Sequence, residues 1–251
     1  MFGLIFLSAI RALLQIPGWW RKIIPGGVLN LLSTQVIVLV LTGQIGIELG
    51  VGLLIVTFAL LLIAWGYLFR IFIDALNGAE NLVLPSWAGW WGYGVAGFWL
   101  FLISLGYSVI AVAGLSMLIS IFGLMPSSPE EGGPLSMLLM FTFIFFYGFL
   151  PIVFTRFAAA GRMWAAFEPG PVLQDLRKII RGDYVQACFG LFGISLLGNL
   201  VLGAIPQVGL ALASVFWFCV MVVFARVLGV LIRKALAPQG PPSQSVDEYR
   251  N

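Results

Sequence analysis

Long apolar runs separated by short polar breaks dominate the pattern of hydrophobic and polar positions along the chain. An α-helix needs about 20 predominantly apolar residues to cross a bilayer. Six runs approach or exceed this length, and the longest calls for a tilt or a protruding end. We therefore predict an all-α integral membrane protein, a six-helix transmembrane bundle with spans at about residues 28–45, 51–69, 95–122, 135–154, 184–205 and 208–232.

Residues 1–27 are predicted to form an N-terminal interfacial helix followed by a membrane anchor. Apolar side chains recur at helical spacing at Phe2, Ile5, Phe6, Ile10, Leu13 and Leu14. Arg11 follows this apolar run, whereas a signal peptide carries its positive charge before it, so we expect the helix to be retained. Pro17 ends the helix, and an aromatic and basic anchor follows at Trp19, Trp20, Arg21 and Lys22.

The rest of the chain divides into two parts. Residues 28–235 form the predicted six-span transmembrane domain. Its sizeable outer loop is 125–134, which contains two acidic residues and no basic one. Residues 236–251 are polar, rich in proline and without apolar periodicity, so we predict a disordered cytoplasmic tail.

A basic stretch, residues 151–184, joins the fourth and fifth predicted spans. Between Pro171 and Arg181 it has an amphipathic pattern, typical of a helix that lies on a membrane surface. The predicted apolar stripe is Val172, Leu173, Leu176, Ile179 and Ile180, and the predicted polar face is Gln174, Asp175, Arg177, Lys178 and Arg181. We expect five basic residues to contact anionic lipid headgroups or a partner: Arg156, Arg162, Arg177, Lys178 and Arg181.

Composition and charge support the membrane class and orient the chain. Hydrophobic residues make up 61% of the sequence and charged residues only 9%, against roughly a quarter in soluble domains. With the N-terminus inside, twelve of the thirteen Lys and Arg residues fall on the cytoplasmic side and none on the outer loops. This positive-inside distribution predicts a multi-pass protein of the cell (inner) membrane with both termini cytoplasmic.

The thirteenth basic residue, Arg226, lies within the sixth predicted span, about two turns before Arg233. Its nearness to the inner face favours a side chain that reaches the interface by snorkelling. The alternative is a functional charge inside the membrane, because ionisable residues at that depth are costly. Both interpretations remain open at the level of sequence.

The chain lacks the residues on which most catalytic chemistry depends. It has no histidine, which removes the commonest general base and metal ligand. Serines such as Ser104, Ser116 and Ser195 lie in apolar runs, and no acidic pair occurs within a span. The two cysteines, Cys188 and Cys219, also lie in apolar runs and suit packing roles. We therefore predict a protein that is not an enzyme, with no catalytic residues, no metal site and no cofactor.

Several motifs occur in an order that resembles the integral-membrane domain-of-unknown-function family 4013. The resemblance covers roughly residues 11–235 and starts with a Trp-basic-basic anchor. A Gly-Tyr-Leu-x-Arg helix end and a Pro-x-Trp link follow, and an amphipathic helix later closes with Gly-Asp-Tyr. These motifs are Trp20, Arg21 and Lys22, then Gly66 to Arg70, Pro85, Ser86 and Trp87, and finally Gly182, Asp183 and Tyr184.

The chain departs from this family in two places. The link before Trp87 is less acidic and holds only Glu80, and Arg226 stands where the family often has histidine. The family has no agreed activity. The resemblance therefore implies a membrane architecture and implies no particular reaction.

Two functions fit these observations. The first is a scaffold or accessory subunit of a membrane assembly, whose basic cytoplasmic face contacts anionic lipid or other membrane protein subunits. The second is a carrier or permease-like protein for a neutral or lipidic small molecule, which could use the neutral polar residues of the spans. The absence of acidic residues inside the spans favours the first. Nucleic acid is not an expected partner, because the basic residues lie at the level of lipid headgroups.

Overall fold

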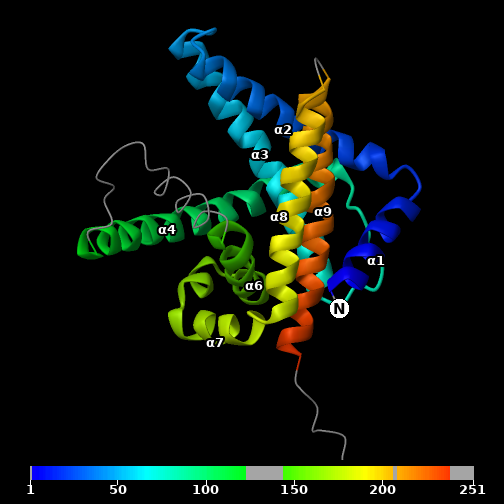
Figure 1. Ribbon diagram of the computed structural model, residues 1–251, viewed down its shortest axis with the longest axis vertical. Coiled ribbons are helices and arrows are strands. Elements are labelled where there is room, and N and C mark those ends of the chain that lie inside the picture. Colours follow the sequence, from blue (N-terminus) through cyan, green and yellow to red (C-terminus); the bar gives the residue numbers. More distant parts are fainter. Residues whose placement is uncertain (1, 123–143, 206–207, 238–251) are drawn as a thin grey trace, which may run out of the picture.

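The computed structural model describes residues 2–122, 144–205 and 208–237, and all regular structure in these ranges is helical (Figure 1). The long helices are α1 (Phe2–Gln15), α2 (Trp19–Leu41), α3 (Ile47–Leu76), α4 (Trp90–Phe122), α6 (Leu150–Ala160), α7 (Pro169–Ile179), α8 (Gly182–Gly203) and α9 (Gly209–Leu236). Three short elements connect them: the 3-10 helices η1 (Trp87–Gly89) and η3 (Met163–Phe167) and the π-helix η2 (Ile144–Phe149).

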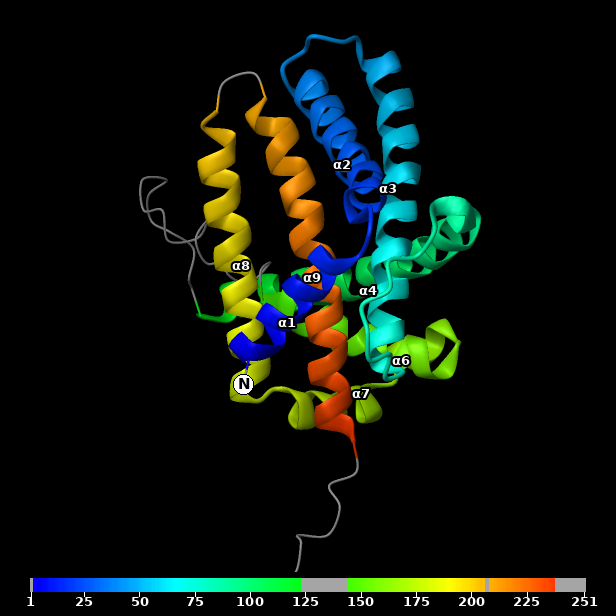
Figure 2. The ribbon, with the colours of Figure 1, turned by 90° about the vertical axis from the view of Figure 1, so that its right-hand side faces the viewer.

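Two antiparallel helix pairs, α2 with α3 and α8 with α9, stand side by side in Figure 2. Helix α9 packs against α2, α3 and α8 and forms the centre of the molecule. In its most apolar 18-residue window, 67% of residues are buried, against 22–28% in the other long apolar helices. The other helices thus turn most of their apolar side chains outward, as expected for contact with lipid.

Small residues let α9 approach its neighbours. A Cβ atom on Gly27 of α2 would lie 2.7 Å from Val215 Cα, and one on Gly229 would lie 2.5 Å from Ala75 Cβ of α3. Close backbone approach of this kind is how membrane helices gain van der Waals contact when lipid is as apolar as their side chains.

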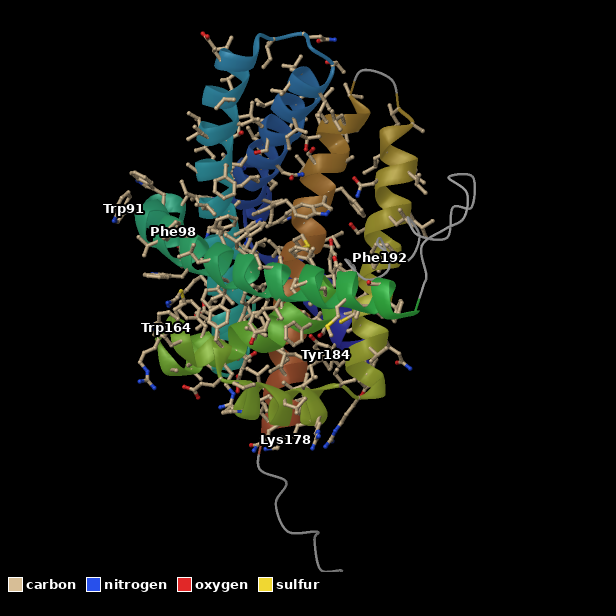
Figure 3. The ribbon with its side chains drawn as sticks, turned by 90° about the vertical axis from the view of Figure 1, so that its left-hand side faces the viewer. Trp91, Phe98, Trp164, Lys178, Tyr184 and Phe192 are labelled. Atoms are coloured by element: carbon tan, nitrogen blue, oxygen red, sulfur yellow. The ribbon has the colours of Figure 1, made fainter. Side chains whose placement is uncertain are left out.

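Helix α4 runs across the two helix pairs and not alongside them, as Figures 1 and 3 show. It crosses α3 at a reciprocal pair of glycines. A Cβ on Gly66 of α3 would lie 1.9 Å from Tyr93 O, and a Cβ on Gly97 of α4 would lie 1.8 Å from Leu62 O. The two backbones are therefore in direct contact, and this contact sets where α4 crosses α3.

The all-α membrane fold is confirmed, whereas the predicted count of six spans is not. Within the described residues, five helical segments are long and apolar enough to cross a membrane. Four of them are in α2, α3, α8 and α9, and the fifth joins η1 to the first part of α4. The predicted span 135–154 is described only from residue 144, where it belongs to a shorter apolar helix, Ile144–Ala160. The direction of α4 also differs from the predicted bundle. Helix α4 runs across the helix pairs (Figure 3), and it contacts α3 backbone to backbone at Gly66 and Gly97.

The terminal parts agree with the predicted helix pattern where they are described. Helix α1 covers nearly the predicted range, and its Ala9 and Leu13 are buried in the main core. The predicted anchor forms the first turn of α2, so this helix begins before residue 28. The predicted outer loop 125–134 and all of the predicted tail beyond residue 237 lie outside the described residues. A position of α1 at a membrane interface stays a prediction.

Candidate functional site at the basic end of the molecule

One end of the molecule gathers most of the candidate residues, and we call it the basic end. It comprises the C-terminal ends of α3, α6 and α9 together with η3 and α7, and it lies opposite the C-terminal ends of α2 and α8 (Figure 2). It carries Arg156, Arg162, Arg177, Lys178, Arg181, Arg233 and Lys234.

Helix α7 forms where the sequence predicts an amphipathic helix, two residues earlier than expected. Pro169 and Pro171 lie in its first turn, where proline costs no hydrogen bond. Arg177 and Lys178 lie in its last turn, where positive charge is favourable next to the unpaired carbonyl groups. The helix packs against α6 and α9.

The inner face of α7 differs from the predicted apolar stripe. Val172, Asp175 and Ile179 are buried, whereas Leu173 and Ile180 are about half exposed. Asp175 therefore does not belong to the outer polar face, and its prediction there is wrong. The outer face combines Leu173, Gln174, Arg177, Lys178 and Ile180.

Arg156 of α6 explains why Asp175 can be buried. Its guanidinium makes a bidentate contact, with Nε donating to Asp175 Oδ2 and Nη2 donating to Oδ1 at 2.8 Å. Nη2 also donates to Pro171 O at 3.2 Å. Asp175 is only 4% exposed, so the ion pair is shielded from water on the side of the carboxylate. Because its two partners lie on different helices, the pair holds α7 against α6. Arg156, predicted to contact lipid, is thus engaged within the protein, and the exposed charge of α7 is wholly basic.

The other four residues of the predicted basic face are exposed. Arg162 precedes η3, Arg177 and Lys178 lie on α7, and Arg181 precedes α8. Trp164 of η3 is 73% exposed, and Figure 3 places it and Lys178 on the outside of the molecule. On α7 and at its C-terminal end, the basic side chains are thus exposed together with two large apolar side chains, Leu173 and Ile180.

Arg226 lies elsewhere, against the segment that connects α3 to η1. Helix α3 ends in a Schellman motif, with Gly78 at φ 89° and Ala79 N donating to Asp74 O at 3.0 Å. Arg226 is buried, and its Nη2 donates to Ala79 O at 2.6 Å and to Glu80 O at 2.8 Å. The side chain therefore holds a non-helical segment to the centre of the molecule.

The rest of this connecting segment is held in the same way. Its carbonyls lack partners in a helix or sheet and accept from side chains of surrounding helices, as buried backbone groups require. The donors are Lys22 Nζ to Leu84 O at 2.6 Å, Tyr93 OH to Ser86 O at 2.8 Å, and Tyr67 OH to Pro85 O at 3.4 Å. Lys22, predicted only as an interfacial anchor, is thus a structural donor.

Trp87 completes this arrangement. Its Nε1 donates to Lys22 O at 2.9 Å, and its ring stacks on Tyr67 with centroids 4.2 Å apart and an interplanar angle of 4°. Phe218 of α9 lies against the same two rings. The Gly-Tyr-Leu-x-Arg and Pro-x-Trp motifs therefore meet around one aromatic cluster, and Lys22 of the Trp-basic-basic anchor, 65 residues before Trp87, lies against it. In the sequence, the one signal of this arrangement is Pro85, because proline interrupts a helix. A segment without a helix needs other donors, here side chains, for its backbone carbonyls.

Replacement of Arg226 is expected to loosen this segment. Arg226→Gln and Arg226→Lys should each lower thermal stability in detergent, because neither side chain reproduces a guanidinium with two carbonyl acceptors. The loss of hydrogen bonds from a charged donor corresponds to about 2 kcal/mol. Unfolding followed by tryptophan fluorescence measures the change. If the Gln variant unfolds at the parent's temperature, the two carbonyls do not depend on Arg226.

The cysteines and the acidic residues form no metal site in the described part of the chain. No group of three or more His, Cys, Asp or Glu residues is arranged to hold a metal ion there. Cys188 Sγ donates to Tyr147 O at 3.3 Å, next to Tyr184 OH, which donates to Gly148 O at 2.7 Å. Pro151, four residues after Tyr147, has no N–H to donate, and the thiol is one donor to the Tyr147 carbonyl.

These features define a multi-pass helical membrane protein with one basic end. The chain belongs to the family described as protein of unknown function (DUF4013), whose model matches residues 49–207. The match runs from α3 to just beyond α8. It therefore includes the segment that connects α3 to η1, the Arg156–Asp175 pair and α7. No curated protein and no solved structure matches the chain.

Proposed function

We propose that the protein is a non-catalytic membrane scaffold or accessory subunit whose basic end contacts anionic lipid headgroups or another membrane subunit on the cytoplasmic side. The observation that carries this proposal is the exposed surface of α7. Its only acid, Asp175, is buried against Arg156, which leaves Arg177 and Lys178 outside. The distribution of basic residues favours the cell (inner) membrane with both termini cytoplasmic.

The chemistry of this surface fits a membrane interface. Each Lys or Arg near anionic lipid contributes about 1 kcal/mol. Leu173 and Ile180 are exposed beside these charges, and Trp164 is exposed on η3; apolar side chains of this kind enter the boundary between headgroups and acyl chains. The basic residues are expected at the level of the lipid headgroups, and this position also favours lipid over nucleic acid as the partner.

Charge reversal on this surface is expected to weaken lipid association. The combined substitutions Arg177→Glu, Lys178→Glu and Arg181→Glu should reduce recovery of the protein with anionic nanodiscs by at least tenfold, because three favourable contacts become repulsive. Added salt should also reduce the recovery of the parent protein with anionic nanodiscs, because salt screens the attraction between exposed charges. Gln174→Ala, an exposed change on the same helix, is the control. Parent-like recovery of the triple variant in lipid and in any co-purifying assembly would show that α7 is only a connector.

The carrier is the second candidate, and one groove favours it. A hollow of about 410 Å³ lies between α2 and α3, lined almost wholly by apolar side chains with Ser33 and Thr57 among them. It could receive a neutral or lipidic molecule. Purification in mild detergent separates the two candidates: a stoichiometric companion supports a subunit, and a monodisperse lone protein supports a carrier.

A further inference from the structure

A second groove opens at the basic end, where the C-terminal ends of α3, α6 and α9 meet. Its volume is about 350 Å³. Leu76, Ala159 and Leu236 contribute apolar surface, and Asn77, Thr155 and Arg233 contribute polar groups. None of the residues that line the groove is acidic.

The polar groups of this groove differ in how much they are already engaged. Thr155 Oγ1 donates to Pro151 O at 3.0 Å within α6. Asn77 and Arg233 are exposed, and within the described ranges neither side chain has a hydrogen-bond or ion-pair partner. Arg233 lies over the turn at Gly78, where a Cβ would come within 2.5 Å of its Nη1. The groove therefore presents one guanidinium and one amide next to an apolar wall.

We propose that this groove binds the phosphate of an anionic phospholipid from the cytoplasmic leaflet, with Arg233 paired to the phosphate oxygens and Asn77 donating to them. The apolar wall of Leu76, Ala159 and Leu236 then lies along the glycerol and the start of an acyl chain. A lipid fits this combination better than a soluble anion, which leaves the apolar wall in water. The inference rests on the proposed function for the leaflet, and it adds a discrete site apart from α7.

The charge at this site depends on Arg233. The C-terminal ends of three helices converge here, and each carries partial negative charge that disfavours an anion. Arg226, two turns away on α9, is committed to Ala79 O and Glu80 O. Loss of Arg233 should therefore remove the preference for anionic lipid and not merely reduce it.

Paired variants test the charge. The full chain in detergent is titrated with phosphatidylglycerol and, separately, with phosphatidylcholine, and bound lipid is counted by native mass spectrometry. The parent should hold one phosphatidylglycerol more tightly than any phosphatidylcholine. Arg233→Gln should weaken that binding at least tenfold, because charge-assisted contacts to phosphate are lost. The control Arg11→Gln changes an exposed basic residue of α1 that neither lines the groove nor belongs to the basic end, and its binding should stay within twofold of the parent.

A second pair of variants tests whether the lipid occupies the groove itself. Ala159 and Ala160 are both exposed at the end of α6, and only Ala159 lines the groove. Ala159→Trp should displace the bound lipid while Ala160→Trp keeps it, and thermal unfolding in detergent should be unchanged in both. Inorganic phosphate at the same concentration should not compete with phosphatidylglycerol.

Three results would overturn the inference: parent-like binding by either Arg233→Gln or Ala159→Trp, an equal loss in Arg11→Gln, or competition by inorganic phosphate. The Arg177, Lys178 and Arg181 reversal separates this inference from the proposed function. If that variant loses nanodisc association while the groove variants behave like the parent, the proposed function stands and the discrete site fails.

Discussion

Gly66→Ala is expected to destabilise the protein strongly and to lower the yield of folded protein, and Gly97→Ala should do the same. Each added methyl group would lie within 2 Å of a backbone carbonyl oxygen on the partner helix, Tyr93 O or Leu62 O. A backbone cannot rotate away as a side chain can, so α3 and α4 must separate. Overpacking in a tight core costs about 3 kcal/mol at the upper end of its usual range. The yield of monodisperse protein and its unfolding temperature measure the effect.

A glycine on the same helix supplies the control. Gly92 of α4 has no atom within 4 Å of its added Cβ, so Gly92→Ala meets no obstacle. Because alanine favours a helix by about 1 kcal/mol over glycine, this variant should be at least as stable as the parent. Parent-like stability of both Gly66→Ala and Gly97→Ala would mean that the two helices do not touch at these glycines.

The second large effect is expected from Asp175→Asn. The substitution leaves the guanidinium of Arg156 without its carboxylate in a position where it is only about one third exposed. Removing one partner of a buried pair costs about 3 kcal/mol, because the remaining charge stays poorly solvated. Thermal unfolding in detergent should show the loss. Asp74→Asn is the matched control, because Asp74 pairs with the exposed Arg70 at 3.3 Å, and such a pair contributes a few tenths of a kcal/mol.

The pair itself can be replaced. The double variant Arg156→Met with Asp175→Leu removes both charges and fills the space with apolar groups, so it should recover most of the stability that Asp175→Asn loses. If the double variant is as unstable as the single one, other contacts of Arg156, such as its bond to Pro171 O, hold α7 in place.

The sequence sufficed to predict the membrane class and most of the helices for a physical reason. A segment in lipid must satisfy its backbone hydrogen bonds internally, so a long apolar run can hardly be anything but a helix. The predicted spans 28–45, 51–69, 184–205 and 208–232 accordingly fall on α2, α3, α8 and α9, although α2 begins and ends earlier and α3 and α9 extend further. The family resemblance is likewise confirmed over residues 49–207.

The side-chain pairings could not be predicted in this way. The amphipathic pattern of α7 marks Asp175 as polar, and a pattern has no means of showing that Arg156, 19 residues earlier, neutralises it. The same holds for Arg226, whose partners are backbone carbonyls 146 and 147 residues away. The path of α4 depends on two glycines in different helices, and each alone reads as an ordinary small residue. Tertiary contact decides all three features.

The orientation of the basic end is the claim on which the lipid proposals depend, and thiol labelling of intact cells tests it directly. Gln44→Cys lies between α2 and α3, and Gly170→Cys lies in the first turn of α7; both positions are exposed. The parent is the control, because Cys188 and Cys219 lie within α8 and α9. A membrane-impermeant maleimide should label Gln44→Cys in intact cells and Gly170→Cys only after the cells are opened. Labelling of Gly170→Cys in intact cells would place the basic end outside and contradict the account.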